Sequence, residues 1–416
     1  MKQQQVDVLV IGAGPAGTVA ASIINKAGFN VSIVEKEQFP RFVIGESLLP
    51  KCMEALDAAG FLPALEKQGF QKKTGAKFIN NQHQIMDFEF SNQFTKGWTW
   101  TWQVPRADFD ATLANEVERM GVSINYQTTV VGINFFDDHS ITKVVDKEGN
   151  EAEIKARFIV DGSGWGRVIP RLLEKERPSG IKARKTIFTH LTDARRKEFS
   201  EPDRIWILDH DKEVWAWCIP FSNGNTSCGF VAESEFFDQF EGTDEEKLRT
   251  IIDSNNIIKE RFRESEFIFA PRSIQGWSST TDKFYGNGYV LTGNVTEFLD
   301  PVFSSGVTLA VTSSRMAADL VVKQLQGESV NWEKEYMDIM MQGIDVFRTY
   351  VLAWYDGSLQ TIFYADQTDP TVTSQICSVL AGYVWDTTNP YVAEHDKNVK
   401  RLVHLIDVNK RIASFQ

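Results

Sequence analysis

A glycine-rich turn near the N-terminus constrains this chain more than any other feature. An apolar run over 6–11 has the length of a buried parallel strand, and Gly12-Ala13-Gly14-Pro15-Ala16-Gly17 follows it. A helix-forming stretch then ends near Gly28, and a second strand over 31–34 ends at Glu35. In such a unit the first glycine permits a tight turn, the second lets backbone N–H groups approach a pyrophosphate, and the third permits close packing of helix on strand. A carboxylate at the end of the second strand can accept both ribose hydroxyls of an adenosine. This order predicts a Rossmann-type dinucleotide site that includes Gly12, Gly14, Pro15, Ala16, Gly17, Glu35 and Lys36.

Later segments favour FAD as the dinucleotide. Two more buried strands are predicted, at 158–161 and 289–292, and a helix over 307–322. The turn before that helix offers N–H groups that suit the O2 atom of an isoalloxazine. A cofactor that reaches from the first turn to this late helix is FAD. We expect the rest of its site to include Val130, Asp161, Gly162, Asn294, Pro301, Ser305, Gly306 and Val307, with Phe303 and Ser304 at the adjoining pocket.

Composition narrows the partners and the compartment. The chain of 416 residues is long enough for two or three domains, and 44 basic against 56 acidic residues give a net charge of −12. An acidic balance argues against nucleic acid and against a polybasic membrane surface. Four cysteines form no CxxC pair, the six histidines show no metal spacing, and no apolar run reaches the ~18 residues of a membrane span. We therefore expect a cytoplasmic protein without a metal or an integral membrane segment.

Five segments between residue 6 and about 325 carry a family resemblance. They are GAGPAG at 12–17, FPRFVIGESLLP at 39–50, VPRADFD at 104–110, FIVDGSG at 158–164 and GNVTEFLDPVFSSGV at 293–307. With them the chain resembles the flavin-dependent monooxygenase superfamily, the para-hydroxybenzoate hydroxylase-like fold, and within it the branch of flavin-dependent halogenases and geranylgeranyl-reductase-like enzymes. Two shorter motifs resemble halogenases in particular: Trp215-Ala216-Trp217-Cys218-Ile219-Pro220, and Gly69-Phe70-Gln71-Lys72-Lys73-Thr74-Gly75-Ala76.

The resemblance implies an FAD-dependent oxidoreductase of the halogenase kind. In that family reduced FAD and O2 give a C4a-hydroperoxide, halide attack yields hypohalous acid, and a lysine, here Lys73, holds it beside an aromatic or carrier-tethered small molecule. Trp215, Trp217 and Pro220 then belong to the pocket, where the tryptophan pair blocks monooxygenation of the substrate. Three alternatives stay open: a geranylgeranyl-reductase-like dehydrogenase or reductase, an aromatic hydroxylase, and a flavin-binding module without catalysis.

Two departures bear on the redox chemistry. The family's late strand ends in Gly-Asp, whereas this chain has Gly293-Asn294, which keeps a hydrogen-bonding group and removes a charge near the flavin. No second dinucleotide fingerprint follows residue 17. We therefore expect electrons to come from a partner flavin reductase or from transient NAD(P)H docking.

Four side chains outside the fingerprint are further candidates. Arg41 could contact the pyrophosphate or be a solvated loop arginine, and Arg106 could reach the FAD phosphates. Glu46 and Ser47 precede a helix predicted over 48–59, so Ser47 could also be its N-cap. If 71–73 is extended, Lys72 and Lys73 point in opposite directions.

These anchors give an α/β fold with three parts. A glutathione-reductase-type Rossmann domain for FAD is assembled from 1–76, 102–180 and 272–325. A β-sheet substrate domain comprises 77–101 and 181–271, with antiparallel strands predicted at 185–191, 204–208, 214–219 and 227–232. A helical C-terminal region covers 326–416.

Overall fold

The computed structural model describes residues 2–366 and 369–414, and two large sheets organise them. The first sheet has the order β18-β19-β10-β1-β2-β7, and β9 and β8 extend it from β10. Its strands β1, β2, β7, β10 and β19 are mutually parallel. The strands of this sheet are β1 (Lys2–Ile11), β2 (Val31–Val34), β7 (Ser123–Asn125), β8 (Thr128–Phe135), β9 (Ser140–Asp146), β10 (Glu151–Asp161), β18 (Tyr285–Gly286) and β19 (Tyr289–Leu291).

The second sheet has the order β16-β12-β15-β14-β13-β4-β5. Its neighbours are antiparallel except for β13 and β4, which run parallel. Hairpins at 209–214 and 221–225 join β13, β14 and β15, as their turn residues predict. The strands are β4 (Gly75–Asn80), β5 (Ile85–Glu89), β12 (Lys185–Thr192), β13 (Ile205–Asp211), β14 (Val214–Pro220), β15 (Asn225–Ala232) and β16 (Arg272–Gln275).

Two small two-stranded ribbons lie outside the large sheets: β3 (Gln71–Lys73) with β6 (Thr101–Gln103), and β11 (Glu176–Pro178) with β17 (Ser279–Thr281). The three-part division remains a proposal. The sheet pairing adds that 272–275, which we assigned to the FAD part, forms the edge strand β16 of the second sheet.

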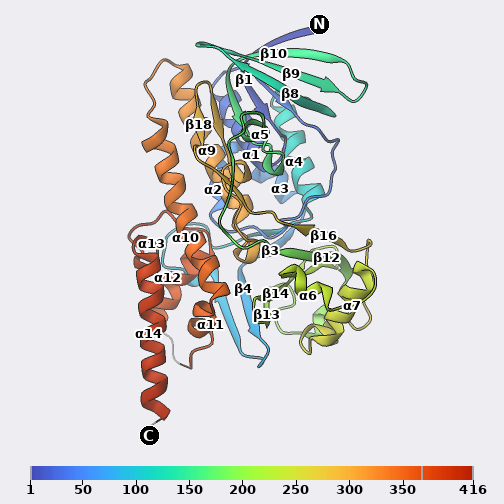
Figure 1. Ribbon diagram of the computed structural model, residues 1–416, viewed down its shortest axis with the longest axis vertical. Helices are drawn as coiled ribbons and strands as arrows, with labels where there is room; N and C mark the ends of the chain where they lie inside the picture. The colour runs from blue at the N-terminus through green and yellow to red at the C-terminus, as the bar shows by residue number, and fades with distance from the viewer. Residues whose placement is uncertain (1, 367–368, 415–416) are drawn as a thin grey trace.

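Helices cover the first sheet and one side of the molecule. Figure 1 shows α1 and α9 beside the first sheet, α6 and α7 against the second, and the C-terminal helices on the left, with α14 ending at the C-terminus. Within the described ranges no helix is both long and apolar enough to cross a membrane. The helices are α1 (Pro15–Lys26), α2 (Cys52–Ala59), α3 (Leu62–Glu66), α4 (Arg106–Arg119), α5 (Val168–Leu172), α6 (Ser234–Asp238), α7 (Asp244–Ser254), α8 (Ile258–Phe262), α9 (Ser305–Leu325), α10 (Asp338–Tyr355), α11 (Ser358–Phe363), α12 (Pro370–Leu380), α13 (Pro390–Ala393) and α14 (His395–Ser414).

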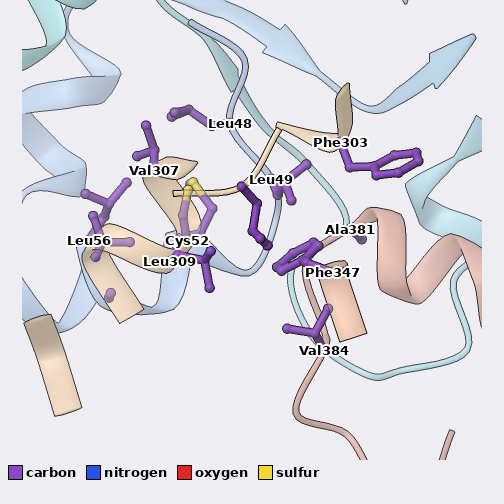
Figure 2. Close-up of a cluster of buried hydrophobic side chains, with 14 of the residues drawn as sticks. Leu48, Leu49, Cys52, Leu56, Phe303, Val307, Leu309, Phe347, Ala381 and Val384 are labelled. Carbon is purple, nitrogen blue, oxygen red and sulfur yellow. The ribbon is translucent and has the colours of Figure 1, made fainter. Parts of the chain in front are cut away.

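The described residues form three clusters of buried hydrophobic side chains, and the first of them joins both large sheets to α9 and the C-terminal helices. Figure 2 shows side chains from the segment before α2, from α9, from α10 and from the turn after α12 packed on one another, among them Leu49, Val307 and Phe347. The prediction of a helix over 48–59 is wrong at its start, because α2 begins only at Cys52. Residues 48 and 49 instead place two fully buried leucines in this core. Ser47 is therefore no N-cap; it forms an isolated bridge with Gln103.

Candidate active site

The glycine turn has the geometry that a pyrophosphate needs. Gly12 has φ +93°, a conformation that favours glycine, and a Cβ on Gly17 would lie 1.8 Å from the carbonyl oxygen of Gly12. Gly14 is different, since among the described residues its Cβ would meet only the Arg41 guanidinium, at 3.5 Å. The backbone at Gly14 is therefore accessible from the cavity side, and it is followed directly by the N-terminus of α1. The N–H groups at a helix N-terminus favour an anion.

Glu35 lies at the end of β2, as expected, and is buried. One carboxylate oxygen accepts a hydrogen bond from the backbone N–H of Ala13 at 2.8 Å, and the other accepts from that of Glu37 at 2.9 Å. These bonds fix the acid beside the glycine turn, where it can receive a ribose.

Asp110 holds the two predicted phosphate-binding arginines. Arg106 donates to both of its carboxylate oxygens at 2.8 and 3.0 Å, and Arg41 donates to one of them at 3.1 Å. Arg106 also donates to the carbonyls of Ile44 and Gly45. Arg106 therefore stabilises the 44–45 segment, whereas a guanidinium nitrogen of Arg41 lies next to Gly14.

A cavity of about 770 Å³ runs from the glycine turn to the second sheet. Its wall includes most residues that the sequence predicts for the cofactor and the pocket: Gly12, Gly14, Pro15, Ala16, Glu35, Lys36, Arg41, Glu46, Ser47, Arg106, Val130, Gly162, Trp215, Trp217, Asn294, Pro301, Ser304, Gly306 and Val307. The same cavity is thus lined by the glycine turn near the N-terminus and by the late segment that leads into α9.

Six predicted residues lie outside this wall. Gly17 packs on Gly12, and the buried carboxylate of Asp161 accepts from the N–H groups of Ser163 and Ile169, so both residues shape the turn. Phe303 is buried and packs its ring against Phe78 and Trp354. The remaining three are Pro220, whose carbonyl accepts from the side chain of Gln103, the buried Ser305, and Lys73.

The second sheet supplies an apolar floor. Trp215 and Trp217, two residues apart on β14, both face the cavity, with ring centroids 5.8 Å apart. Ile205, Ile207 and Val231 line it beside them. Each indole N–H has a partner, for Trp215 the hydroxyl of Tyr355 at 2.9 Å and for Trp217 that of Ser227 at 3.0 Å.

Lys73 lies directly behind the cavity wall. Its ammonium donates to the hydroxyl of Ser47 at 2.8 Å and to the carbonyl of Leu48 at 2.9 Å, and its nitrogen lies 5.5 Å from the centre of the Phe90 ring. Burial, with a smaller effect from the positive charge of Arg204, lowers the pKa of Lys73 to about 7. Lys72 is exposed and stacks on Trp100, so the prediction that the two lysines point in opposite directions is confirmed.

The sequence analysis missed a buried pair between Glu46 and His190. The imidazole Nε2 of His190 contacts one Glu46 oxygen, and the other oxygen of this fully buried carboxylate has no hydrogen-bond partner among the described residues. His190 lies on β12 two residues beyond Phe188, which lines the cavity. The sequence could have indicated this position, because residues two apart on a strand share a face, and His190 follows the apolar Phe188 by two.

Comparison with known proteins agrees with this geometry. Residues 5–332 match the family described as FAD binding domain. The chain is 25% identical over 409 residues to the 1H-pyrrole-2-carbonyl-[peptidyl-carrier protein] chlorinase of Pseudomonas fluorescens, covering 92% of this chain and 91% of the relative. It is 28% identical over 355 residues to a flavin-dependent halogenase of Armillaria mellea, covering 79% and 69%.

Solved structures extend the likeness to the whole fold. A flavoprotein/dehydrogenase from Cytophaga hutchinsonii is 55% identical, with a TM-score of 0.96 over 98% of this chain and 100% of that one. A flavin-dependent brominase, 23% identical, shares the fold with a TM-score of 0.82 over 98% of this chain and 100% of that one. The chain therefore belongs to the FAD binding domain family, and it is an FAD-dependent oxidoreductase that resembles the flavin-dependent halogenases.

Proposed function

We propose that this protein halogenates an electron-rich aromatic small molecule, free or tethered to a carrier protein. The observation that carries the proposal is the position of Lys73, which donates a hydrogen bond to Ser47, a residue that lines the cavity. Curated relatives named as a chlorinase and as a flavin-dependent halogenase match 92% and 79% of this chain at 25% and 28% identity.

Different residues of the cavity wall would bind different parts of the cofactor. We assign the adenosine to Glu35, the pyrophosphate to the turn Gly12–Gly14 with Arg41, and the isoalloxazine to the region of Asn294 and the N-terminus of α9. Reduced FAD, when bound, supplies the activation of O2. Trp215 and Trp217 form the floor and exclude water from the reacting centre.

Lys73 acts on the oxidised halogen species. With a pKa of about 7, its amine is populated in both the neutral and the charged form at neutral pH. The neutral amine can take the halogen of hypohalous acid, with its own proton and the hydroxide leaving as water, or it can accept a proton. The charged form can donate a hydrogen bond. Ser47 and the carbonyl of Leu48 fix the nitrogen in one place for either role.

The proposal also includes the source of electrons, a halide as co-substrate and the cellular compartment. A partner flavin reductase or NAD(P)H reduces the cofactor, and a halide is consumed. The chain works in the cytoplasm, a setting that suits its four free, buried cysteines.

A second candidate is reduction of an apolar double bond. It is favoured by the floor, where the aliphatic side chains of Ile205, Ile207 and Val231 lie beside the tryptophans. The 55% identical solved structure carries the description flavoprotein/dehydrogenase, which also suits this chemistry.

Bromination of an activated phenol separates the two candidates. The purified protein is supplied with a flavin reductase, NADH, O2 and bromide, and products are followed by mass spectrometry. Lys73→Ala should abolish brominated product while FAD binding and NADH-driven release of peroxide continue. The matched control is Lys72→Ala, which changes the exposed neighbour and should leave the yield unchanged.

The result that rejects halogenation is equally concrete. Wild-type protein that consumes reduced flavin, yet halogenates no activated phenol, indole or pyrrole, would leave the reductase as the better assignment.

A further inference from the structure

A chain of three side chains links the C-terminal helices to the cavity floor. The indole N–H of Trp215 donates to the hydroxyl of Tyr355 at 2.9 Å, and that hydroxyl donates to a carboxylate oxygen of Asp300 at 2.8 Å. Trp215 and Asp300 are almost completely buried, and Tyr355 is half-buried at the last position of α10.

The direction of these bonds follows from chemistry. An indole nitrogen can only donate, so the single hydrogen of the Tyr355 hydroxyl must go to Asp300. The second oxygen of Asp300 accepts the N–H of Val302 at 3.2 Å. The chain therefore requires one oxygen of Asp300 to accept from Tyr355, while the other oxygen accepts from the turn that follows.

Both ends of the chain lie at the cavity. Trp215 is part of the floor, and Asp300 caps the turn whose residues Pro301 and Ser304 lie in the wall before α9. Tyr355 lies outside the wall, and Arg184 stacks on its ring at 4.0 Å. One phenol thus holds the floor and the turn before α9 in a fixed relation.

We propose that Tyr355 is a positioning residue, which locks the orientation of the Trp215 indole to the Asp300 turn and so lets α10 set the shape of the substrate pocket. The proposal depends on the cavity and not on halogen chemistry, so it can fail or stand independently of the proposed function.

Protonation of Asp300 should loosen the link. Burial raises the pKa of Asp300 to about 6, and the hydrogen bond from Tyr355 and the charge of Arg184 oppose this rise. The other acids near Arg184 are Glu213 and Glu233, which pair with it. Below the pKa, Asp300 carries a proton and accepts less well, so the Trp215 ring should lose its fixed orientation.

Fluorine NMR on the FAD-loaded protein tests the link directly. The tryptophans are labelled with 5-fluorotryptophan, and the Trp215 resonance is assigned by its loss in Trp215→Phe. In the wild type this resonance should shift with pH, with a midpoint near 6. In Tyr355→Phe it should move at pH 7.5 and no longer follow the titration, and Asp300→Asn should also remove the titration.

Tyr350→Phe is the matched control. Tyr350 is a buried tyrosine on the same helix, and its hydroxyl has no hydrogen-bond partner among the described residues. This variant should leave the Trp215 resonance and its midpoint as in the wild type. A Trp215 resonance that is unaffected by Tyr355→Phe, or one that changes equally in both tyrosine variants, would overturn the assignment.

Discussion

At the scale of single residues, the glycines of one turn meet different constraints. A Cβ on Gly17 would collide with the carbonyl oxygen of Gly12, so this glycine is required by the fold itself. A Cβ on Gly14 would make only an ordinary contact with Arg41. We therefore expect the need for glycine at 14 to come from the cofactor, because a side chain there would occupy the place that we propose for the pyrophosphate.

Gly14→Val should consequently fold without its flavin. We expect a melting temperature of the apoprotein close to that of wild type and flavin occupancy reduced at least tenfold, measured from the ratio of visible to ultraviolet absorbance. Gly17→Val, in contrast, should lower the yield of folded protein. Full yellow colour in Gly14→Val would show that the fingerprint does not hold the cofactor.

Asn294 invites a test of redox tuning at the same scale. It lies in the cavity wall, and the guanidinium of Arg167 donates to its backbone carbonyl at 2.9 Å, so the position is fixed by the main chain. Asn294→Asp should keep FAD and lower its midpoint potential, because a nearby anion opposes formation of an anionic hydroquinone. A change of ~30 mV corresponds to about 1.4 kcal/mol for two electrons. The exposed Asn287 provides the control Asn287→Asp, and a rise in potential at 294 would contradict the placement beside the flavin.

At the scale of elements, a buried ion pair fastens α8 to the end of β12. Arg261 and Asp193 are fully buried, their closest nitrogen and oxygen atoms are 2.5 Å apart, and Thr226 donates to the same carboxylate at 2.6 Å. The guanidinium also stacks on Trp206 at 4.4 Å. The pair thus supports the far face of the sheet whose near face forms the cavity floor.

Arg261→Met should be strongly destabilising, because it leaves Asp193 buried without its counter-charge. We expect the free energy of unfolding to fall by about 3–5 kcal/mol, measured by urea denaturation of the holoprotein. The comparison variant is Arg195→Met, which removes an arginine paired with the exposed Glu198 and Glu260 and should change stability little. Similar losses in the two variants would show that burial is not the cause.

At the scale of the whole molecule, buried carboxyl groups give stability an unusual pH dependence. Burial raises the pKa of Asp209 to about 6, with a smaller opposing effect from the side chain of Gln360. In the unfolded chain an aspartate titrates near 3.9, so between the two values the folded state binds more protons. Stability from this group is therefore highest at acidic pH and falls as the pH rises towards 6.

Asp209→Asn should raise the melting temperature at pH 7.5 and have little effect below pH 4. Asp146 gives the opposite sign, because hydrogen bonds from the side chain and backbone of Asn150 lower its pKa. Asp146→Asn should therefore reduce stability at pH 7.5, with less loss as the pH falls through the pKa of Asp146. Calorimetric scans from pH 3.5 to 8 would distinguish the two; equal stabilisation by Asp209→Asn at every pH would exclude the titration as its cause.

The sequence alone determined the parts whose chemistry is local. A glycine turn between an apolar strand and a helix, with an acid at the end of the next strand, leaves few arrangements, so β1, α1, β2 and the place of Glu35 were predicted correctly. The alternation in β14 similarly placed both tryptophans on one face.

Tertiary structure decided what depends on partners distant in sequence. Lys73 lies behind the cavity wall because Ser47 and Leu48, some 25 residues away, take its hydrogen bonds. Ser47 lies outside the helix predicted for its segment and forms a β-bridge with Gln103. Glu46 contacts His190, which is 144 residues further along the chain. Periodicity reports which face a side chain occupies, but only the packing of remote segments decides which groups meet there.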